Sequence, residues 1–127
     1  MEQTHLKINK EICGTPIEIK EDYSRVRLKT TSDMIVDNSN LIHGGFIFGL
    51  ADYAAMVAIN HPNVVLGGAN VKFLKPTILG DELIAEAKLI RIEVKKHVVE
   101  VTVKREDLII FQGEFYCYIP VTNVLKN

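Results

Sequence analysis

The feature that most constrains this chain is a long stretch that is almost free of charge. Between Asn38 and Val71 there is no Lys, Arg or Glu, and Asp52 is the only formal charge. Inside that stretch, the residues over 44–60 are apolar around the whole circumference of a helix, not along one side. A helix of that kind is enclosed on most faces. The stretch therefore predicts one central helix that ends before Pro62 and is wrapped by the rest of the chain.

The remaining segments alternate apolar and polar residues, which is typical of strands with one solvated face. Those after residue 80 are joined by short turns and predict an antiparallel meander. The pair Gly67-Gly68 is interpreted as a turn before a strand. One long helix and a long antiparallel sheet predict an α+β fold with the sheet wrapped around the helix, and a partner chain is expected to cover what the sheet leaves open. The predicted strands lie within 16–30, 69–76, 82–94, 97–107 and 108–120.

A chain of 127 residues without repeats or linkers is expected to form one domain over 1–127. We expect an N-terminal helical segment over 1–14, with the helix itself over 4–12, then a core over 15–120 and a tail over 121–127. The net charge of -1 argues against a nucleic-acid or membrane partner.

The N-terminal residues are too charged for a signal peptide, and the two cysteines, Cys13 and Cys117, fit no metal or redox spacing. They are expected to be reduced thiols of a cytoplasmic protein. The four histidines also lack metal-ligand spacing, so no metal and no cofactor is expected.

Asp52 is the main candidate for chemistry. One interpretation is a carboxylate that meets a basic residue or backbone elsewhere, or points to solvent at a helix edge. Burying a charge without a partner is costly, however, and no basic residue lies within one helical turn of it. The other interpretation is therefore a partly desolvated carboxylate that faces a cleft and acts as a general base or nucleophile.

The two glycines that open the helix, Gly44 and Gly45, are the second candidate. Backbone N–H groups in the first turn have no partner within the helix, and a ligand can approach them closely where there is no Cβ. This arrangement suits an oxyanion site, although close packing against a strand would also explain two glycines. His43, just before them, is expected to orient the turn rather than to act as a base.

The spacing of these candidates has a consequence. Gly44 and Asp52 are eight residues apart, or ~12 Å along a helix axis. Because a reacting carbonyl must lie within about 3 Å of both groups, one helix cannot supply both to the same atom. If both act, they come from two subunits, and the chain is expected to be a homodimer with two shared sites.

The segment 43-HGGFIFGLAD-52 resembles the hotdog-fold acyl-CoA thioesterases of the phenylacetic-acid-degradation (PaaI-like) branch. The likeness continues through 69-ANVKFLKPTILGDELIAEAKLIR-91 and covers roughly residues 15–120. It implies a hotdog fold, a dimer or dimer of dimers, and hydrolysis of an acyl-CoA, with coenzyme A present only as part of the substrate. In that family the N–H at the position of Gly44 polarises the thioester carbonyl. The carboxylate at Asp52, from the facing subunit, activates water or attacks directly.

The resemblance also implies further substrate-binding residues. The family often has an Asn in the loop before the glycines, a role open here to Asp37, Asn38 or Asn40. Apolar side chains on the helix suit an acyl pocket, although core packing explains them equally well: Phe46, Phe48, Tyr53 and Met56. Basic side chains on the strands suit phosphate binding or a solvated face: Lys72, Lys75, Lys104 and Arg105.

Two departures bear on activity. Related thioesterases carry a Ser or Thr that holds the water, whereas the turn after Asp52 reads Tyr53, Ala54, Ala55, Met56. A dehydratase is disfavoured because five residues separate Asp37 from His43, where that chemistry uses four. Three hypotheses remain: an acyl-CoA thioesterase, a non-catalytic acyl-CoA-binding or sensing dimer, and a structural dimer. The sequence does not determine the acyl type.

Overall fold

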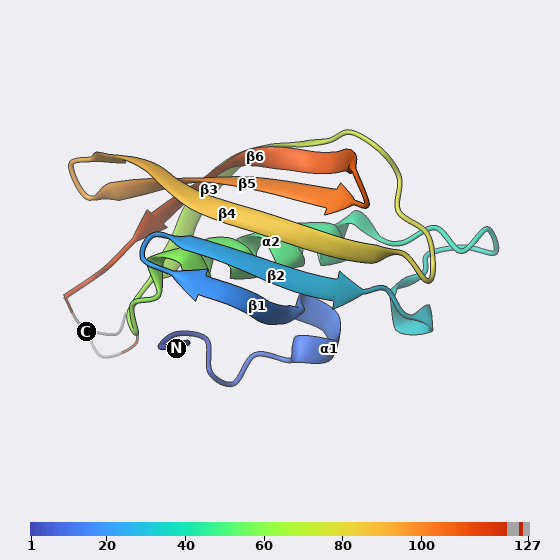
Figure 1. The fold of residues 1–127 in the computed structure, drawn as a ribbon, viewed down its shortest axis with the longest axis horizontal. Coiled ribbons are helices and arrows are strands. Elements are labelled where there is room, and N and C mark those ends of the chain that lie inside the picture. The colour runs from blue at the N-terminus through green and yellow to red at the C-terminus, as the bar shows by residue number, and fades with distance from the viewer. Residues whose placement is uncertain (122–124, 126–127) are drawn as a thin grey trace.

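Six antiparallel strands form one sheet that curls around a single long helix in the computed structural model, which describes residues 1–121 and 125 (Figure 1). The strand order is β1-β2-β4-β5-β6-β3, so β1 and β3 are the edges. The sheet wrapped around a helix is confirmed, as is the meander β4-β5-β6. The elements are α1 (Lys10–Cys13), β1 (Thr15–Lys20), β2 (Tyr23–Lys29), the 3-10 turn η1 (Ser32–Met34), α2 (Gly44–Ile59), β3 (Val65–Phe73), β4 (Glu82–Glu93), β5 (Lys96–Arg105) and β6 (Leu108–Tyr118).

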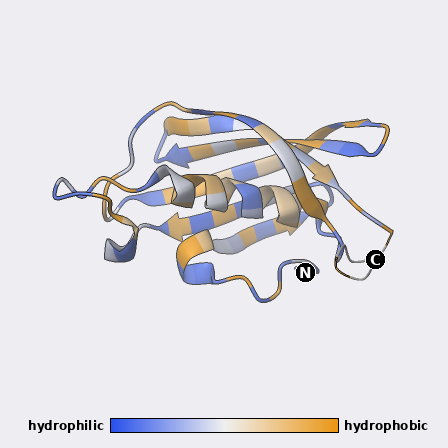
Figure 2. Ribbon diagram, turned by 180° about the vertical axis from the view of Figure 1, so that it is seen from behind, coloured by the Kyte–Doolittle hydropathy of each residue, from blue (hydrophilic) through white to orange (hydrophobic). Residues whose placement is uncertain are grey.

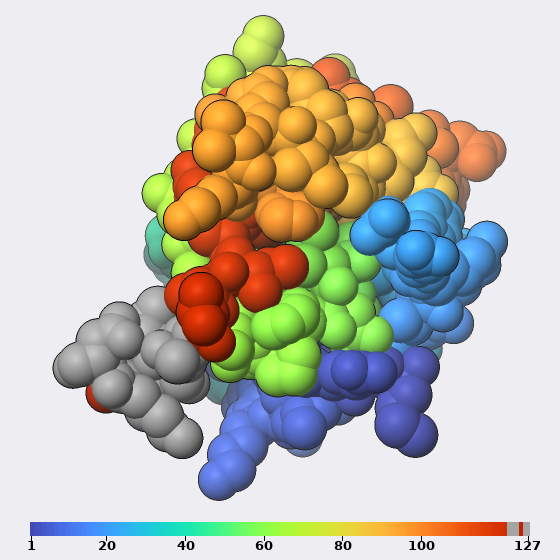
Figure 3. All heavy atoms as spheres, turned by 90° about the vertical axis from the view of Figure 1, so that its left-hand side faces the viewer, coloured from blue at the N-terminus to red at the C-terminus, as the bar shows by residue number. Residues whose placement is uncertain are grey.

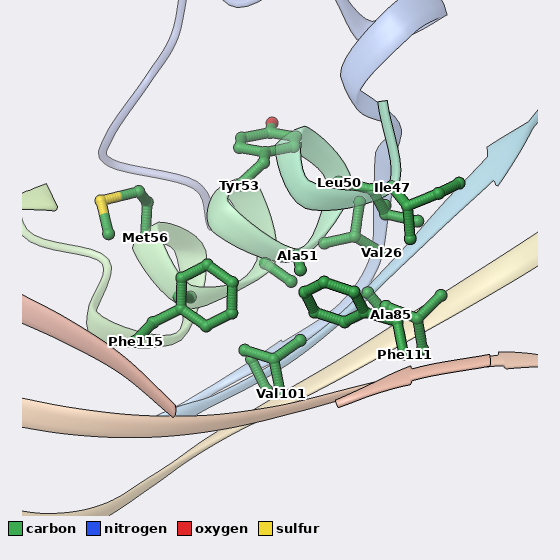
Figure 4. Packing of buried hydrophobic residues seen from close by; sticks show 14 of the residues in the cluster. Val26, Ile47, Leu50, Ala51, Tyr53, Met56, Ala85, Val101, Phe111 and Phe115 are labelled. Carbon is green, nitrogen blue, oxygen red and sulfur yellow. The ribbon is translucent and has the colours of Figure 1, made fainter. Parts of the chain in front are cut away.

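Helix α2 is the predicted central helix. It ends at Asn60, which adopts a left-handed conformation (φ 53°) and donates its N–H to the carbonyl of Met56 at 2.8 Å. Between α2 and the sheet, Ala51, Val101, Phe111 and Phe115 form the middle of the core, as Figure 4 shows. Their side chains are fully buried, which fixes the helix against the concave face of the sheet.

The predicted N-terminal helix over 4–12 is wrong in extent. Helix α1 begins only at Lys10, because the side chain of Asn9 accepts a hydrogen bond from the N–H of Glu11 at 2.9 Å and caps it. Upstream, His5 has a positive φ and its carbonyl accepts the N–H of Ile8 at 3.1 Å, so residues 1–9 form an irregular segment with a turn, called the N-terminal strap below. Figure 3 shows the strap in blue against the green end of α2. The predicted tail lies mostly outside the described residues.

The interpretation of Gly67-Gly68 as a turn is also wrong. Both lie inside β3, which begins at Val65 and has a register shift opposite β6 at this point. A Cβ on Gly67 would lie 2.4 Å from the ring of Tyr118, so glycine lets that ring lie across the strand. None of the helices in the described part of the chain is long and apolar enough to cross a membrane.

Candidate active site on helix α2

The first turn of α2 presents free backbone donors. His43 is the N-cap residue but its side chain makes no capping hydrogen bond. The N–H of His43 bonds to Met34 and that of Phe46 to His43, whereas within residues 1–121 and 125 no hydrogen bond reaches the N–H of Gly44 or Gly45. Two adjacent donors at the positive end of a 16-residue helix are suited to an anion or a polarised carbonyl oxygen.

A side chain at either glycine would lie close to a neighbouring ring. A Cβ on Gly44 would lie 3.3 Å from the ring of Phe73, and one on Gly45 would lie 2.8 Å from the imidazole of His43. The imidazole therefore folds back over the first turn, where it packs edge-on against Phe46 at 6.1 Å between ring centroids. His43 covers the turn rather than capping it, and its side chain is exposed.

Asp52 carries a carboxylate with a buried oxygen that has no partner. Its Oδ1 atom is inaccessible to solvent and makes no hydrogen bond with any described residue. Burial raises the pKa of this carboxyl from 3.8 to about 6. The same negative charge is a secondary cause of the raised thiol pKa values of Cys13 and Cys117, after burial. The interpretation of Asp52 as satisfied by a basic residue therefore does not hold within the protomer.

Asp52 faces the open side of α2. Gly45, Gly49 and Asp52 follow one another at helical spacing on one face, and all three retain exposure in the protomer. This face is turned away from the sheet and is visible in Figure 2. Neither Gly44 nor Asp52 lines the surface hollows found elsewhere on the described residues. One protomer therefore supplies the carboxylate and the donor pair outside these hollows.

The loop before the helix separates its three polar candidates. Asp37 accepts hydrogen bonds from the N–H and hydroxyl of Ser39 and from the N–H of Leu41, and these bonds lower its pKa. Asn40 has a positive φ of 64°, and its carbonyl accepts from Leu79. Asp37 is therefore engaged in holding the loop itself. The side-chain amides of Asn38 and Asn40 are exposed and make no hydrogen bond in the described part of the chain.

The four apolar candidates on α2 lie in two different environments. Tyr53 is 1% exposed and points away from the sheet, under the N-terminal strap (Figure 4). Its hydroxyl bonds to Lys10 at 2.8 Å and to Glu2. Met56 is also buried, so both belong to the protomer's own packing. Phe46 and Phe48 are half-buried beside the open face and stay candidates for an acyl contact.

The basic candidates also differ in their surroundings: one is engaged in a loop and two are exposed. Arg105 donates to the carbonyl of Pro76 and to Asp81, both at 3.0 Å, so it braces the loop between β3 and β4. Lys72 lies exposed on the edge strand β3, with Lys75 just beyond it. These two lysines are the cations nearest along the chain to Phe73, the residue that covers Gly44.

Thr77 is a further polar residue beside the start of α2. Its carbonyl accepts the N–H of Ile42 at 2.8 Å, two residues before Gly44. The side chain is 3% exposed, and its Oγ1 has no hydrogen-bond partner among the described residues. A threonine in a loop carries no sequence signal of this kind, because only the tertiary contact with Ile42 places it beside the helix start.

Comparison with known proteins gives a family and a fold. Residues 39–110 match the family model of the thioesterase superfamily. The structure of the uncharacterized protein PH1136 from Pyrococcus horikoshii superposes with a TM-score of 0.97 at 50% identity, over 99% of this chain and 97% of that one. PaaI of the phenylacetic acid degradation operon of E. coli superposes with a TM-score of 0.74 at 24% identity, over 81% and 80%. A hypothetical thioesterase from Streptococcus pneumoniae, solved with coenzyme A, gives 0.75 at 16% identity, over 84% of both chains. The expected hotdog fold is confirmed.

The curated relatives are longer proteins. The chain is 51% identical to a methylthioribose-1-phosphate isomerase from Aquifex aeolicus over 90% of its own length but only 25% of that protein. It is 28% identical to the transcription factor FapR from Caldanaerobacter subterraneus over 92% of its own length and 59% of FapR. The match therefore concerns one part of each relative.

Proposed function

The chain belongs to the thioesterase superfamily, and we propose that it hydrolyses the thioester of an acyl-coenzyme A at a site shared by two copies of the chain. The observation that carries this proposal is the carboxylate of Asp52, whose buried oxygen has no hydrogen-bond partner among the described residues and whose pKa is about 6. A carboxylate with that pKa is largely ionised at neutral pH and is a stronger base than an ordinary one.

The proposed reaction uses the carboxylate and the helix donors on opposite sides of the thioester. Asp52 takes a proton from a water molecule as that water attacks the carbonyl carbon, and the carbonyl oxygen becomes an oxyanion. The N–H of Gly44, assisted by the helix dipole, stabilises this oxyanion. Collapse breaks the carbon–sulfur bond, and the thiolate of coenzyme A leaves with the proton held by Asp52. Direct attack by the carboxylate gives an anhydride that water then hydrolyses, with the same products.

Two protomers are needed because α2 holds its own Gly44 and Asp52 ~12 Å apart. The edge strand β3 has an unpaired side, and the open face of α2 lies beside it. Pairing of two such edges around a two-fold axis would bring Gly44 of one chain toward Asp52 of the other. The exposed Lys72 and Lys75 are suited to the phosphates of coenzyme A, which the fold neighbour from S. pneumoniae holds.

The test is a hydrolysis screen of the wild-type protein against short, long and aromatic acyl-CoAs, with Asp52→Ala beside it. We expect release of free coenzyme A by the wild type and loss of release in the variant, with acyl-CoA binding retained. A wild type that is monomeric in sedimentation at assay concentration would contradict the shared site.

A second candidate is a non-catalytic acyl-CoA-binding dimer that reports its ligand. It is favoured by the absence of a Ser or Thr in the turn after Asp52 and by the likeness to a transcription factor. Saturable binding of an acyl-CoA without release of coenzyme A, by wild type and Asp52→Ala alike, would support it.

A further inference from the structure

Gly49 is a glycine that nothing in the protomer requires. It lies in the interior of α2, where glycine destabilises a helix relative to alanine because its backbone loses more freedom on folding. Its backbone is outside the left-handed region, and a Cβ built on it would have no atom within 4 Å. A side chain is therefore permitted by the conformation and by the space, yet none is present.

The other glycines of the site differ from Gly49. A Cβ at Gly44 would lie close to the ring of Phe73 and one at Gly45 close to the imidazole of His43, although both of these side chains can shift. No described neighbour approaches a Cβ at Gly49, so a ligand or a second chain is the structural reason left for this glycine.

The position of Gly49 indicates which ligand atoms are involved. It precedes Asp52 by three residues, so it lies one turn away on the same open face. A carbonyl carbon within reach of the Asp52 carboxylate can place one of its two substituents, the acyl group or the sulfur of coenzyme A, over this turn. The neighbouring side chains Phe46 and Phe48 are apolar and half-buried, and Phe48 packs against Phe115 at 5.2 Å between ring centroids. Such surroundings suit a hydrocarbon group better than the polar amides of pantetheine.

We propose that the missing side chain at Gly49 makes room for the part of the acyl group next to the thioester carbon, and so allows bulky acyl groups. This inference rests on the proposed function, because it assumes an acyl-CoA bound at Asp52. Gly49 is then a residue that determines acyl specificity and takes no part in the chemistry. A single methyl group placed there discriminates between small and bulky acyl groups.

The experiment is Gly49→Ala, assayed with acetyl-CoA and with acyl-CoAs that are branched or aromatic next to the carbonyl. The affinity of the same esters is measured in the Asp52→Ala background, which separates binding from hydrolysis. We expect the preference for bulky over acetyl esters to fall by about 10-fold or more in both readouts, as one methyl group in an apolar pocket can cause. The melting temperature should rise, because alanine favours the helix.

Three results would overturn this assignment. One is an equal loss for every ester, which would place pantetheine over Gly49. Another is weaker self-association with an unchanged acyl preference, which would mean that the glycine serves the crossing of two α2 helices. The third is an unchanged acyl preference together with unchanged self-association. If the wild type binds acyl-CoAs without hydrolysing them, the proposed function fails. The ratio of the affinities for bulky and acetyl esters, compared between wild type and Gly49→Ala, then still tests the role of Gly49.

Discussion

Asp52 and Tyr53 are neighbours on α2 with opposite hydrogen-bonding states: the hydroxyl of Tyr53 is held by Lys10 and Glu2, whereas Oδ1 of Asp52 is buried without a described partner. The difference follows from the helix, which turns successive side chains by about 100°. Tyr53 thereby faces the N-terminal strap, and Asp52 faces the open side. The strap therefore contributes to the hydrogen bonding of the Tyr53 hydroxyl and leaves the Asp52 carboxylate available for a ligand.

The first prediction concerns the pH dependence of hydrolysis. A base with a pKa of about 6 is protonated and inactive below that value and ionised above it. The kcat/KM for a good acyl-CoA should therefore rise about tenfold per pH unit below the pKa and level off above it. A profile that levels off already near pH 4 would show that an unperturbed carboxylate or another group is the base.

The second prediction concerns stability. Because the folded-state pKa of Asp52 is raised above 3.8, the group is protonated in both states in acid and has no effect there. As the pH rises from 3.8 to about 6, the unfolded chain ionises while the folded carboxyl stays protonated, so stability is lost across this window and the loss is complete above it. Asp52→Asn should therefore raise the free energy of unfolding by about 3 kcal/mol at pH 8 and change it little at pH 4. Urea unfolding at both pH values measures this, and Asp107→Asn in an exposed turn is the control. Equal effects at the two pH values would contradict the prediction.

The third prediction tests whether the site is shared. Gly44→Pro removes the proposed oxyanion N–H at the first helical position, where proline is well tolerated. His43 has ψ 130°, which suits a residue before proline. We expect a folded dimer with kcat reduced by about 100-fold or more.

Mixing the Gly44→Pro and Asp52→Ala chains gives the decisive measurement. If the site is shared, each heterodimer has one intact site, built from Asp52 of the first chain and Gly44 of the second. Activity should then return toward half of the wild-type value per heterodimer. No recovery in verified heterodimers would mean that each chain uses its own pair of residues.

The fourth prediction concerns the N-terminal strap. Tyr53→Phe removes a hydroxyl that accepts from Lys10 at 2.8 Å and bonds to Glu2. The loss should cost about 1–3 kcal/mol of stability and speed proteolytic cleavage before residue 10, because the strap loses its anchor. Tyr116→Phe, whose hydroxyl lies 3.3 Å from Glu114, is the matched control and should change little. Unchanged cleavage in Tyr53→Phe would mean that the bonds of Asn60 to Met1 and Gln3 hold the strap alone.

The fifth prediction concerns the strand pair at the sheet edge. A Cβ on Gly113 would lie 2.4 Å from the carbonyl oxygen of Asn70 and 2.6 Å from Cα of Val71, and neither backbone atom can move aside cheaply. Gly113→Ala should therefore destabilise the fold by about 3 kcal/mol and loosen β3. Gly68→Ala, whose Cβ would lie 3.4 Å from Tyr116, is the control and should cost much less. Amide hydrogen exchange in β3 distinguishes loosening of this strand from global destabilisation.

Much of the architecture could be predicted from local pattern. The uncharged stretch and its apolar circumference predicted α2 to within one residue at its end, and the alternation after residue 80 predicted the meander. The extent of α1 and the role of Gly67-Gly68 were wrong for different reasons. The cap formed by Asn9 starts α1 late and Asn60 holds the residues before it, whereas Gly67 depends on the distant ring of Tyr118, which lies across it.

Local pattern is enough to identify the groups available for chemistry: one carboxylate in an apolar helix and two glycines at its start, spaced so that a single helix cannot bring them together. Periodicity and rise per residue suffice for that conclusion, because they are properties of the local backbone. The environment of each group depends on the folded chain. The tertiary structure left Oδ1 of Asp52 buried without a described partner, placed Tyr53 under the strap, engaged Asp37 in its own loop and left Gly49 facing open space. Burial and hydrogen bonding are set by residues distant in the chain, so the pKa and the reach of each side chain appear only when the fold brings those residues together.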